Sequence, residues 1–322
     1  MKIQADITTC LLDRLPPFYI HEKEVCLTDI LNVASIDTLR LSIFSQNSSL
    51  LSFEKSLEIF NTLSFGEGRG GVKQSLYLCI HCSDTWADPS HQDIPAAWNF
   101  SDIKGLKFCF VDYLTFIFET VKAKNINVRY IQVGNEISNG LLWHWLSSPY
   151  EYVDFIKTAH YLCRQYFPAA KIVLHTDLSY SSQKACAWYE LMEKQKVDYD
   201  LIGLSYYPVW HGPLKQLEKT VSGVSELTGK KVILCEIGYM NTEQKTSAWF
   251  GHWKCDDIPY SPEGQRLYLE YFKEFLQQKL SSYLHPEMFY WGMFSYHNDE
   301  HFPVALFDRR GNALPAFYEL KR

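Results

Sequence analysis

Two glutamates, each near the end of an apolar run, are the residues best suited to do chemistry in this chain. YIQVGNE (130–136) ends in Asn135 and Glu136, and KVILCE (231–236) ends in Glu236. Paired carboxyl groups flanking a cleft can cleave a glycosidic bond, because one protonates the leaving oxygen while the other, ionised, attacks the anomeric carbon. Proximity of two negative charges raises the pKa of one of them, so a single pair can supply both forms. A glutamate at a strand end is more often a rim salt-bridge partner. Asn135 favours catalysis, because its amide can bind a sugar 2-hydroxyl.

Eight short β-rich or apolar runs could position these residues. They lie at 2–6, 37–44, 75–81, 128–134, 171–175, 200–206, 231–235 and 287–294. Segments with helical spacing fill gaps between them, at 107–125, at 150–167 and after Ser261-Pro262. Unbroken apolar runs are typical of parallel strands buried on both faces, and their alternation with helices predicts right-handed βαβ units. Eight units in 322 residues predict one (β/α)8 barrel domain spanning 1–322. The alternative is a doubly wound open sheet, but no Gly-rich phosphate turn follows the first run.

Residues of chemical interest stand at the C-terminal end of nearly every run. They are Asp6, Arg40, His81, Asp84, Asn135, Glu136, His175, Ser205, Tyr206, Glu236 and Trp291. In a (β/α)8 barrel these ends meet on one face, where the active site forms. We therefore expect Glu136 and Glu236, on the fourth and seventh runs, to face each other across the barrel mouth.

Composition narrows the class of ligand. A hydrophobic content of 47% with 21% charged residues is ordinary for a globular protein with a sizeable core. The net charge of −6 argues against nucleic acid or an anionic membrane as the main partner. Aromatic residues make up 16%, including 21 Tyr and 9 Trp. Such rings commonly fill cores, but they also stack on sugars, so their excess mildly favours a carbohydrate.

The N-terminus and the cysteines bear on location and on metals. The first residues contain no apolar stretch of signal-peptide length, and no run approaches the roughly 18 apolar residues of a membrane span. If this is the natural start, we expect a cytoplasmic protein with reduced thiols; a removed export signal would instead make it secreted. Nine cysteines cannot all pair within one chain. CIHC (79–82) has redox-pair spacing but closes a strand, and the histidines lack zinc-ligand spacing. We expect neither a metal nor a cofactor.

Five motifs, in order along the chain, resemble glycoside hydrolase family 53, the endo-β-1,4-galactanases. They are CSDTWADPSHQDIPAAW (82–98), QVGNEISNGLLW (132–143), LIGLSYYPVWHG (201–212), VILCEIGY (232–239) and IPYSPEGQ (258–265). The match runs from ADITT (5–9) to ALFDRRGNALPAF (305–317), which is essentially the whole chain. The family belongs to a clan of retaining (β/α)8 glycosidases with catalytic glutamates on strands four and seven. The resemblance implies β-galactan or a galacto-oligosaccharide as the substrate.

The resemblance also implies roles for individual residues. Glu136 would be the general acid/base and Glu236 the nucleophile. Arg40 matches an arginine near the nucleophile, and Tyr206 matches a tyrosine that can hydrogen-bond it. Trp291 matches a platform under the sugar in subsite −1. The stretch that lines the glycone side contributes His81, Asp84, Trp86 and Asp88.

Several of these residues also have plainer interpretations. Trp86 and Trp291 could be packing residues, and Asp88 could start a turn at Pro89. His81 could be a satisfied core histidine, and Arg40 a structural ion pair.

Departures from the family leave alternatives open. Ser42 stands where members often carry a second arginine, and Gly292-Met293 replace the usual Glu-Pro after Trp291. Segment 240–257 lacks a clear Asp/Asn-rich loop, so the calcium site of some bacterial members is doubtful. Chain length preference, and possibly linkage, could therefore differ. The alternatives are another glycosidase of the clan (a mannanase, a xylanase or an exo-acting galactosidase) and a non-catalytic galactan-binding barrel.

Overall fold

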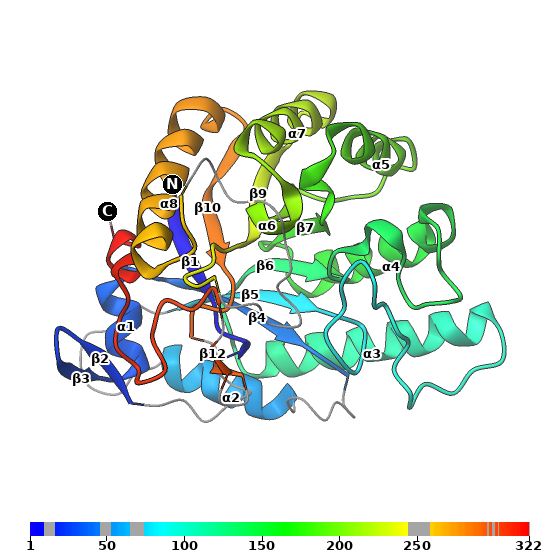
Figure 1. Ribbon diagram of the computed structural model, residues 1–322. Coiled ribbons are helices and arrows are strands. Elements are labelled where there is room, and N and C mark those ends of the chain that lie inside the picture. Colours follow the sequence, from blue (N-terminus) through cyan, green and yellow to red (C-terminus); the bar gives the residue numbers. More distant parts are fainter. Residues whose placement is uncertain are drawn as a thin grey trace.

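Eight parallel strands close into a barrel (Figure 1). The computed structural model describes residues 1–9, 17–45, 53–64, 74–243, 258–294, 296–297, 300–301 and 303–321. The barrel strands are β1 (Lys2–Asp6), β4 (Thr38–Ile43), β5 (Ser75–Ile80), β6 (Val128–Val133), β7 (Lys171–Thr176), β8 (Leu201–Tyr206), β9 (Lys231–Ile237) and β10 (Leu284–Tyr290). The predicted (β/α)8 fold is confirmed, and every run predicted as a strand overlaps one of these eight.

Helices surround the strands in Figure 1. They are α1 (Leu27–Val33), α2 (Phe53–Ser64), α3 (Ile103–Ala123), α4 (Pro149–Tyr166), α5 (Ser182–Lys194), α6 (Pro208–His211), α7 (Leu214–Thr228) and α8 (Pro262–Phe275), with a π-helical turn at Leu276–Leu280. Two short hairpins, β2 (Phe18–Ile20) with β3 (Lys23–Val25) and β11 (Tyr296–His297) with β12 (Glu300–His301), lie outside the barrel sheet. Helix α8 begins where its sequence predicts: Ser261 Oγ accepts a hydrogen bond from the Gly264 amide at 3.0 Å, and Pro262 fills the first turn.

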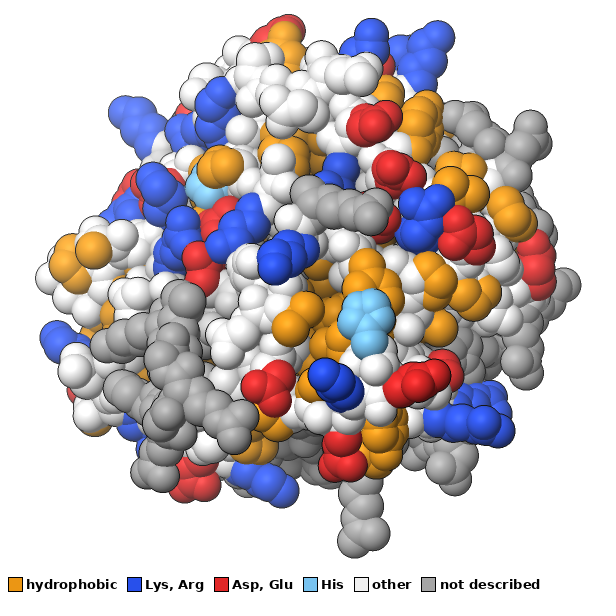
Figure 2. All heavy atoms as spheres, turned by 90° about the vertical axis from the view of Figure 1, so that its left-hand side faces the viewer, with side chains coloured by type: hydrophobic (Ala, Val, Ile, Leu, Met, Phe, Trp, Pro, Cys, Tyr) orange, Lys and Arg blue, Asp and Glu red, His pale blue; other side chains and the backbone are white. Residues whose placement is uncertain are grey.

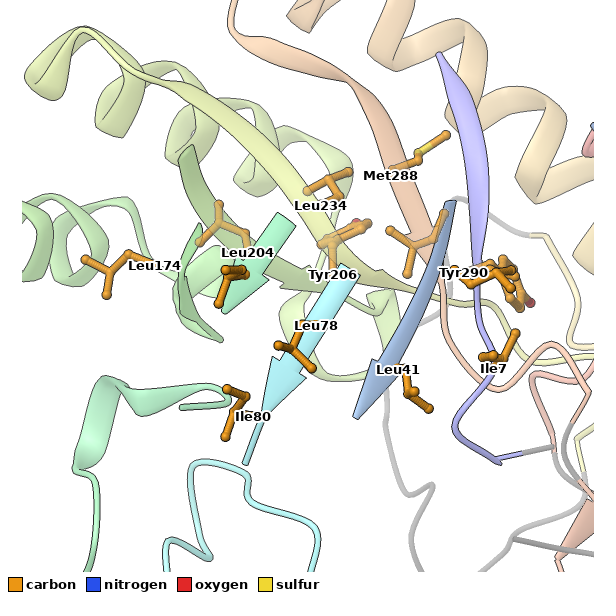
Figure 3. Packing of buried hydrophobic residues seen from close by; sticks show 14 of the residues in the cluster. Ile7, Leu41, Leu78, Ile80, Leu174, Leu204, Tyr206, Leu234, Met288 and Tyr290 are labelled. Carbon is orange, nitrogen blue, oxygen red and sulfur yellow. The ribbon is translucent and has the colours of Figure 1, made fainter. Parts of the chain in front are cut away.

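Strand alternation sorts side chains into two apolar layers. The barrel interior holds Tyr77, Tyr130, Val173, Leu201, Ile233, Cys235 and Phe289. Between strands and helices lies a larger cluster that includes Leu41, Leu78, Leu174, Leu204, Tyr206 and Leu234 (Figure 3). Because successive side chains on a strand point to opposite faces, the residues between members of this outer layer point into the barrel. Arg40 and Ser205 are in this position, which gives them access to the barrel mouth.

The surface is mixed in charge. On the face shown in Figure 2, basic and acidic side chains are interspersed, with hydrophobic side chains between them. None of the helices in the described part of the chain is long and apolar enough to cross a membrane.

Candidate active site

A cleft of about 550 Å³ contains most of the predicted site residues. Its lining includes Trp86, Asp88, Asn135, Glu136, Glu236 and Trp291. These six come from the ends of the third, fourth, seventh and eighth barrel strands or from the loops that follow them. Convergence of strand ends therefore brings together residues that are up to 205 positions apart, from Trp86 to Trp291.

A β-bulge aims Glu236 into the cleft. On one side of β9, Leu204 pairs with Leu234 but the next residue, Ser205, pairs with Glu236, so β9 carries one extra residue at Cys235. Cys235 faces the barrel interior. In a regular strand Glu236 would then point outward, toward the helices. The bulge reverses that direction and places the carboxyl group at the mouth, a common use of bulges beside active sites.

Two donors hold the Glu236 carboxylate. Arg40 Nη2 lies 2.9 Å from its Oε1, and the Tyr207 hydroxyl donates to its Oε2 at 3.0 Å. Arg40 is fully buried and also pairs with Asp6, Nη1 lying 2.5 Å from Oδ2. The predicted position of Arg40 beside Glu236 is confirmed, and its alternative role as a structural ion pair also holds. Arg40 binds the carboxylates rather than lining the cleft.

The predicted hydrogen bond from Tyr206 to Glu236 is wrong. Tyr206 is the last residue of β8, and its ring belongs to the outer apolar layer (Figure 3). There it stacks on Phe272 with ring centroids 5.7 Å apart. Its hydroxyl donates instead to the Gly212 carbonyl at 2.8 Å. Alternation explains the error, because Ser205 takes the inward position and the chain turns only at Tyr207. The structure therefore gives this hydrogen bond to Tyr207.

Glu136, three residues after the end of β6, has an unusual backbone conformation. Its φ of 50° and ψ of 49° are left-handed, a region that residues other than glycine seldom occupy. Such local strain persists where the surrounding structure enforces it, often at functional sites. The preceding Gly134 also has a positive φ, 81°, so the strand turns sharply within three residues. This turn presents the Glu136 carboxyl group to the cleft.

The electrostatic surroundings of the two glutamates differ. Burial raises the pKa of Glu136 well above its ordinary value, and the negative charges of Glu236 and Asp177 raise it further. Burial also raises the pKa of Glu236, but there the Arg40 charge and the Tyr207 hydrogen bond favour the ionised form. Because the Arg40 cation sits against Glu236, whereas the carboxylates of Glu236, Asp177 and Asp88 all raise the pKa of Glu136, a single shared proton belongs on Glu136.

Asn135 links Arg40, which binds Glu236, to the loop after β5. Its Oδ1 accepts from Arg40 Nη2 at 3.0 Å and from Gln132 Nε2 at 2.9 Å. Its Nδ2 donates one hydrogen to the Ala87 carbonyl at 2.8 Å, which ties it to the cleft-lining loop after β5. An amide nitrogen carries two hydrogens, so the second can still meet a ligand in the cleft.

His81 and Asp84, which the resemblance places on the glycone side, make hydrogen bonds that support that loop. His81 Nδ1 accepts from the Ala87 amide at 2.9 Å, and burial lowers the pKa of His81 to about 3, so its ring stays neutral. Asp84 accepts from the Ala96 amide at 2.8 Å and from the Ser45 hydroxyl. Neither belongs to the lining of the described cleft. His81 is buried like a core histidine, but only its Nδ1 is satisfied, because its buried Nε2 has no hydrogen-bond partner in the described part of the chain.

Asp88 is both a turn residue and part of the cleft lining. Its Oδ1 accepts from the Ser90 amide at 2.6 Å, which makes it a turn residue, and it pairs with His91 at 3.0 Å. It also lines the cleft.

Aromatic rings form the remaining walls. Trp86 and Trp291 meet edge to face with centroids 6.0 Å apart, and Tyr207 approaches Trp291 at 6.3 Å in the same manner. Trp210 packs on Tyr207 at 5.1 Å and remains 44% exposed. Flat apolar surface beside paired carboxyl groups suits a polyhydroxylated ring with one apolar face.

A family model describes nearly the whole chain. Glycosyl hydrolase family 53 matches residues 22–320. This chain belongs to glycosyl hydrolase family 53. It is therefore a glycosidase.

Named relatives agree with this membership. "Probable arabinogalactan endo-beta-1,4-galactanase A" from Neosartorya fischeri is 30% identical over 282 residues, covering 83% of this chain and 77% of the relative. "Arabinogalactan endo-beta-1,4-galactanase A" from Aspergillus niger is 25% identical over 287 residues, covering 85% and 80%.

Solved structures share the fold. The GH53 catalytic domain of Ignisphaera aggregans superposes with a TM-score of 0.85 at 22% identity, covering 99% of this chain and 94% of that one. A fungal β-1,4-galactanase gives 0.86 at 21% identity, with 100% and 99% covered. An endo-1,4-beta-xylanase from Caldicellulosiruptor owensensis gives 0.64 at 15% identity, with 100% and 96% covered.

The cleft residues of this glycosidase that were missed from the sequence include Asp177, Tyr207 and Trp210. Asp177 follows β7 and accepts a hydrogen bond from the Ser138 hydroxyl; burial raises its pKa. Its position two residues after His175, at a strand end, was an available signal. Tyr207 and Trp210 stand in SYYPVWHG, where only the strand boundary tells which tyrosine faces the cleft.

The described residues contain no cluster of three or more His, Cys, Asp or Glu able to hold a metal ion. The doubtful calcium segment falls mostly on 244–257, outside the described residues. In CIHC, burial raises the pKa of the Cys79 thiol to about 12, which disfavours a reactive thiolate. The seven described cysteines are free thiols.

Proposed function

We propose that this family 53 glycosidase hydrolyses β-1,4-linked galactan or galacto-oligosaccharides by a double displacement with net retention. The observation that carries the mechanism is the asymmetry of the two carboxyl groups in one cleft. Glu236 is held by a cation and a hydroxyl, whereas Glu136 is buried among negative charges. The substrate class rests on the galactanase names of the relatives.

In the first step, Glu236 attacks the anomeric carbon as a carboxylate. Arg40 and Tyr207 keep it ionised and fix its orientation before attack. Glu136 donates its proton to the glycosidic oxygen as the bond to the leaving sugar breaks. The product of this step is a glycosyl ester on Glu236, with the former leaving group released as a free hydroxyl.

In the second step, Glu136 acts as a base instead of an acid. Once the Glu236 charge is consumed in the ester, one cause of the raised Glu136 pKa disappears. Its carboxylate then accepts a proton from water, which attacks the anomeric carbon and releases Glu236. Glu136 ends protonated, ready for another cycle, and the sugar keeps its original configuration.

The neighbouring groups support binding of the sugar. Trp291 and Trp86 offer apolar surface for a ring face, and the spare Asn135 amide hydrogen can meet the 2-hydroxyl of the sugar being attacked. A hydrogen bond to that hydroxyl strengthens as positive charge develops at the adjacent carbon, so it would favour the transition state over the bound substrate.

The mechanism is tested with Glu136→Ala, Glu236→Ala and azide. Glu236→Ala should abolish turnover on both activated and unactivated substrates. Glu136→Ala should retain reaction with an aryl galactoside carrying a good leaving group, and azide should accelerate it and give a β-galactosyl azide. Full activity of either variant on galactan, or an α-configured first product of the native enzyme, would refute the assignment.

The substrate is tested with linear β-1,4-galactan, short galacto-oligosaccharides, xylan and mannan, each followed by product chromatography. Galactan cleavage is expected. Preferential cleavage of xylan or mannan would retain the mechanism but overturn the substrate class. Tight galactan binding without hydrolysis by the native protein would indicate a non-catalytic barrel.

A further inference from the structure

Gln132, a fully buried residue of β6, holds the turn that carries Asn135 and Glu136. Its side-chain Nε2 donates to the Gly134 carbonyl at 3.0 Å and to Asn135 Oδ1 at 2.9 Å. An amide nitrogen carries two hydrogens, so these two bonds use both of them. One side chain therefore fixes both the backbone and the Asn135 amide at the point where the strand ends.

Tyr77, on the neighbouring strand β5, fixes the direction of the Gln132 amide. The Tyr77 hydroxyl donates to Gln132 Oε1 at 2.7 Å, so the amide oxygen faces Tyr77 and the amide nitrogen faces the turn. The same hydroxyl lies 3.1 Å from Sγ of Cys235, the extra residue of the β9 bulge. The Tyr77 ring lies beside the Arg40 guanidinium, with 5.6 Å between Cζ and the ring centroid. One phenol thus joins the strand that leads to Glu136 to the strand that carries Glu236.

The backbone of this turn needs such support. Gly134 and Glu136 both have a positive φ, 81° and 50°, and the left-handed region is strained for a glutamate. Strained conformations persist only where neighbouring groups enforce them. Without the Gln132 amide, the Gly134 carbonyl loses a buried donor and the turn can relax. A relaxed turn would move both the Glu136 carboxyl group and the Asn135 amide.

We propose that Gln132, oriented by Tyr77, is a positioning residue that holds Glu136 and the Asn135 amide in their catalytic directions. The roles of Glu136 as acid/base and of Asn135 as the group that meets the sugar 2-hydroxyl come from the proposed function, on which this inference rests. Gln132 and Tyr77 are fully buried and do not line the described cleft, so they act through their neighbours. Orientation is a large effect, because a misplacement of about 1 Å can cost on the order of 100-fold in rate.

The first test compares Gln132→Met with Gln4→Met. Methionine is also unbranched and fills the space while removing both amide hydrogens. Gln4 is equally buried, and its Nε2 donates to Asp37 and to Glu287 at 2.7 Å each, toward the N-terminal ends of the strands. In Gln132→Met, kcat on galactan should fall at least about tenfold while KM changes less than about threefold. Gln4→Met should keep the native kcat, and a Gln132→Met enzyme that also keeps it would overturn the proposal.

A second readout reports on the Asn135 amide. The kcat/KM values are measured for an aryl β-galactoside and for its 2-deoxy analogue. Their ratio, parent over 2-deoxy, should be about two- to tenfold smaller in Gln132→Met than in the native enzyme, because the hydrogen bond to the 2-hydroxyl is weakened. General loosening of the barrel would lower both values together and leave the ratio unchanged. An unchanged ratio would therefore overturn the proposal.

Tyr77→Phe covers the case in which Gln132→Met does not fold, because it keeps the ring and removes only the hydroxyl. Tyr130→Phe is its control: Tyr130 lies in the same barrel-interior layer, but its hydroxyl donates to Glu287. Tyr77→Phe should lower kcat about threefold or more and lower the same substrate ratio, whereas Tyr130→Phe should change neither. Absence of glycosidase activity in the native protein would refute the proposed function. An active native enzyme with a Tyr77→Phe variant that matches Tyr130→Phe would refute only the positioning role.

Discussion

Arg40 Nη2 lies 2.9 Å from Glu236 Oε1 and 3.0 Å from Asn135 Oδ1, so one guanidinium nitrogen ties the seventh barrel strand to the residue next to Glu136. The other nitrogen, Nη1, holds Asp6 from the first strand at 2.5 Å. The side chain is fully buried, and its planar fork has a donor for each partner. A lysine ammonium, which is a point charge on a flexible stem, cannot reproduce that geometry.

Replacing Arg40 should therefore damage both stability and activity. In Arg40→Met the carboxylates of Asp6 and Glu236 lose their buried cation, and removing one partner of a buried pair costs about 3–5 kcal/mol of unfolding free energy. The Glu236 pKa should rise, moving the acidic limb of kcat/KM upward, and kcat should fall at least about 100-fold. Arg40→Lys should recover only part of each loss. Urea unfolding and pH–rate profiles measure these effects.

Arg164→Met is the matched control for Arg40. Arg164 pairs with Asp198 and Asp200, each at 2.8 Å, but keeps 27% side-chain exposure. Partly exposed pairs contribute about 0–1 kcal/mol, so the variant should unfold only slightly earlier and keep the native pH–rate profile. If Arg40→Met behaves like Arg164→Met, the buried guanidinium does not have the role assigned to it.

Asp177→Asn should move the basic limb of kcat/KM to lower pH. The negative charge of Asp177 helps to raise the Glu136 pKa. Removing that charge lets Glu136 lose its proton at lower pH, so the basic limb should shift down by about half a unit. Asp198→Asn, at an exposed position, is the control and should not shift it. An unchanged or upward-shifted limb in Asp177→Asn would show that Asp177 does not act on Glu136 through its charge.

The fold was predictable because it depends on patterns repeated along the chain. Eight apolar runs alternate with segments of helical spacing, and the Ser261-Pro262 start of α8 carries its own signal. Single-residue irregularities were not predictable. The extra residue at Cys235 follows from the pairing of β9 with its neighbours, and nothing local in KVILCEI marks it.

The site was predictable to the extent that strand ends converge. Glu136, Glu236, Asn135 and Trp291 meet as expected, whereas His81 is turned into the loop that it supports. Which face a side chain takes depends on where the strand ends, and a shift of one residue exchanges the faces. That is how Tyr206 came to be assigned the contact that Tyr207 makes.

Phenylalanine substitutions separate the two tyrosines. Tyr207→Phe removes the hydroxyl 3.0 Å from Glu236 Oε2, so kcat on galactan should fall about 10- to 100-fold with a modest loss of stability. Tyr206→Phe removes the hydrogen bond to Gly212, which should cost about 1 kcal/mol of unfolding free energy and leave kcat within about twofold. Steady-state kinetics and thermal unfolding on the same samples measure both. The reverse pattern would restore Tyr206 as the residue that binds Glu236.

Buried neutral histidines should make the protein sensitive to acid. Burial lowers the pKa of His160 to about 4, that of His211 to about 4 and that of His81 to about 3. A group with a lowered folded-state pKa binds its proton more readily when unfolded. Stability from these residues is therefore complete above the unfolded value of about 6.5 and is lost as pH falls toward their folded values. Glu136 and Glu236 act in the opposite sense over this range. Because their pKa values are raised in the folded protein, their contribution to the free energy of unfolding becomes more favourable as pH falls and they gain protons.

A difference measurement isolates the histidine effect from the carboxyl groups. His160 lies outside the cleft, with Nδ1 2.7 Å from the Asp198 carbonyl, so His160→Phe should leave the pH–rate profile intact. Between pH 7 and pH 5 the native protein should lose roughly 1–2 kcal/mol more unfolding free energy than His160→Phe, because only the native unfolded chain gains a proton at that position. Urea unfolding at the two pH values gives both losses. Equal losses would mean that His160 is already protonated in the folded protein, which the burial of its ring argues against.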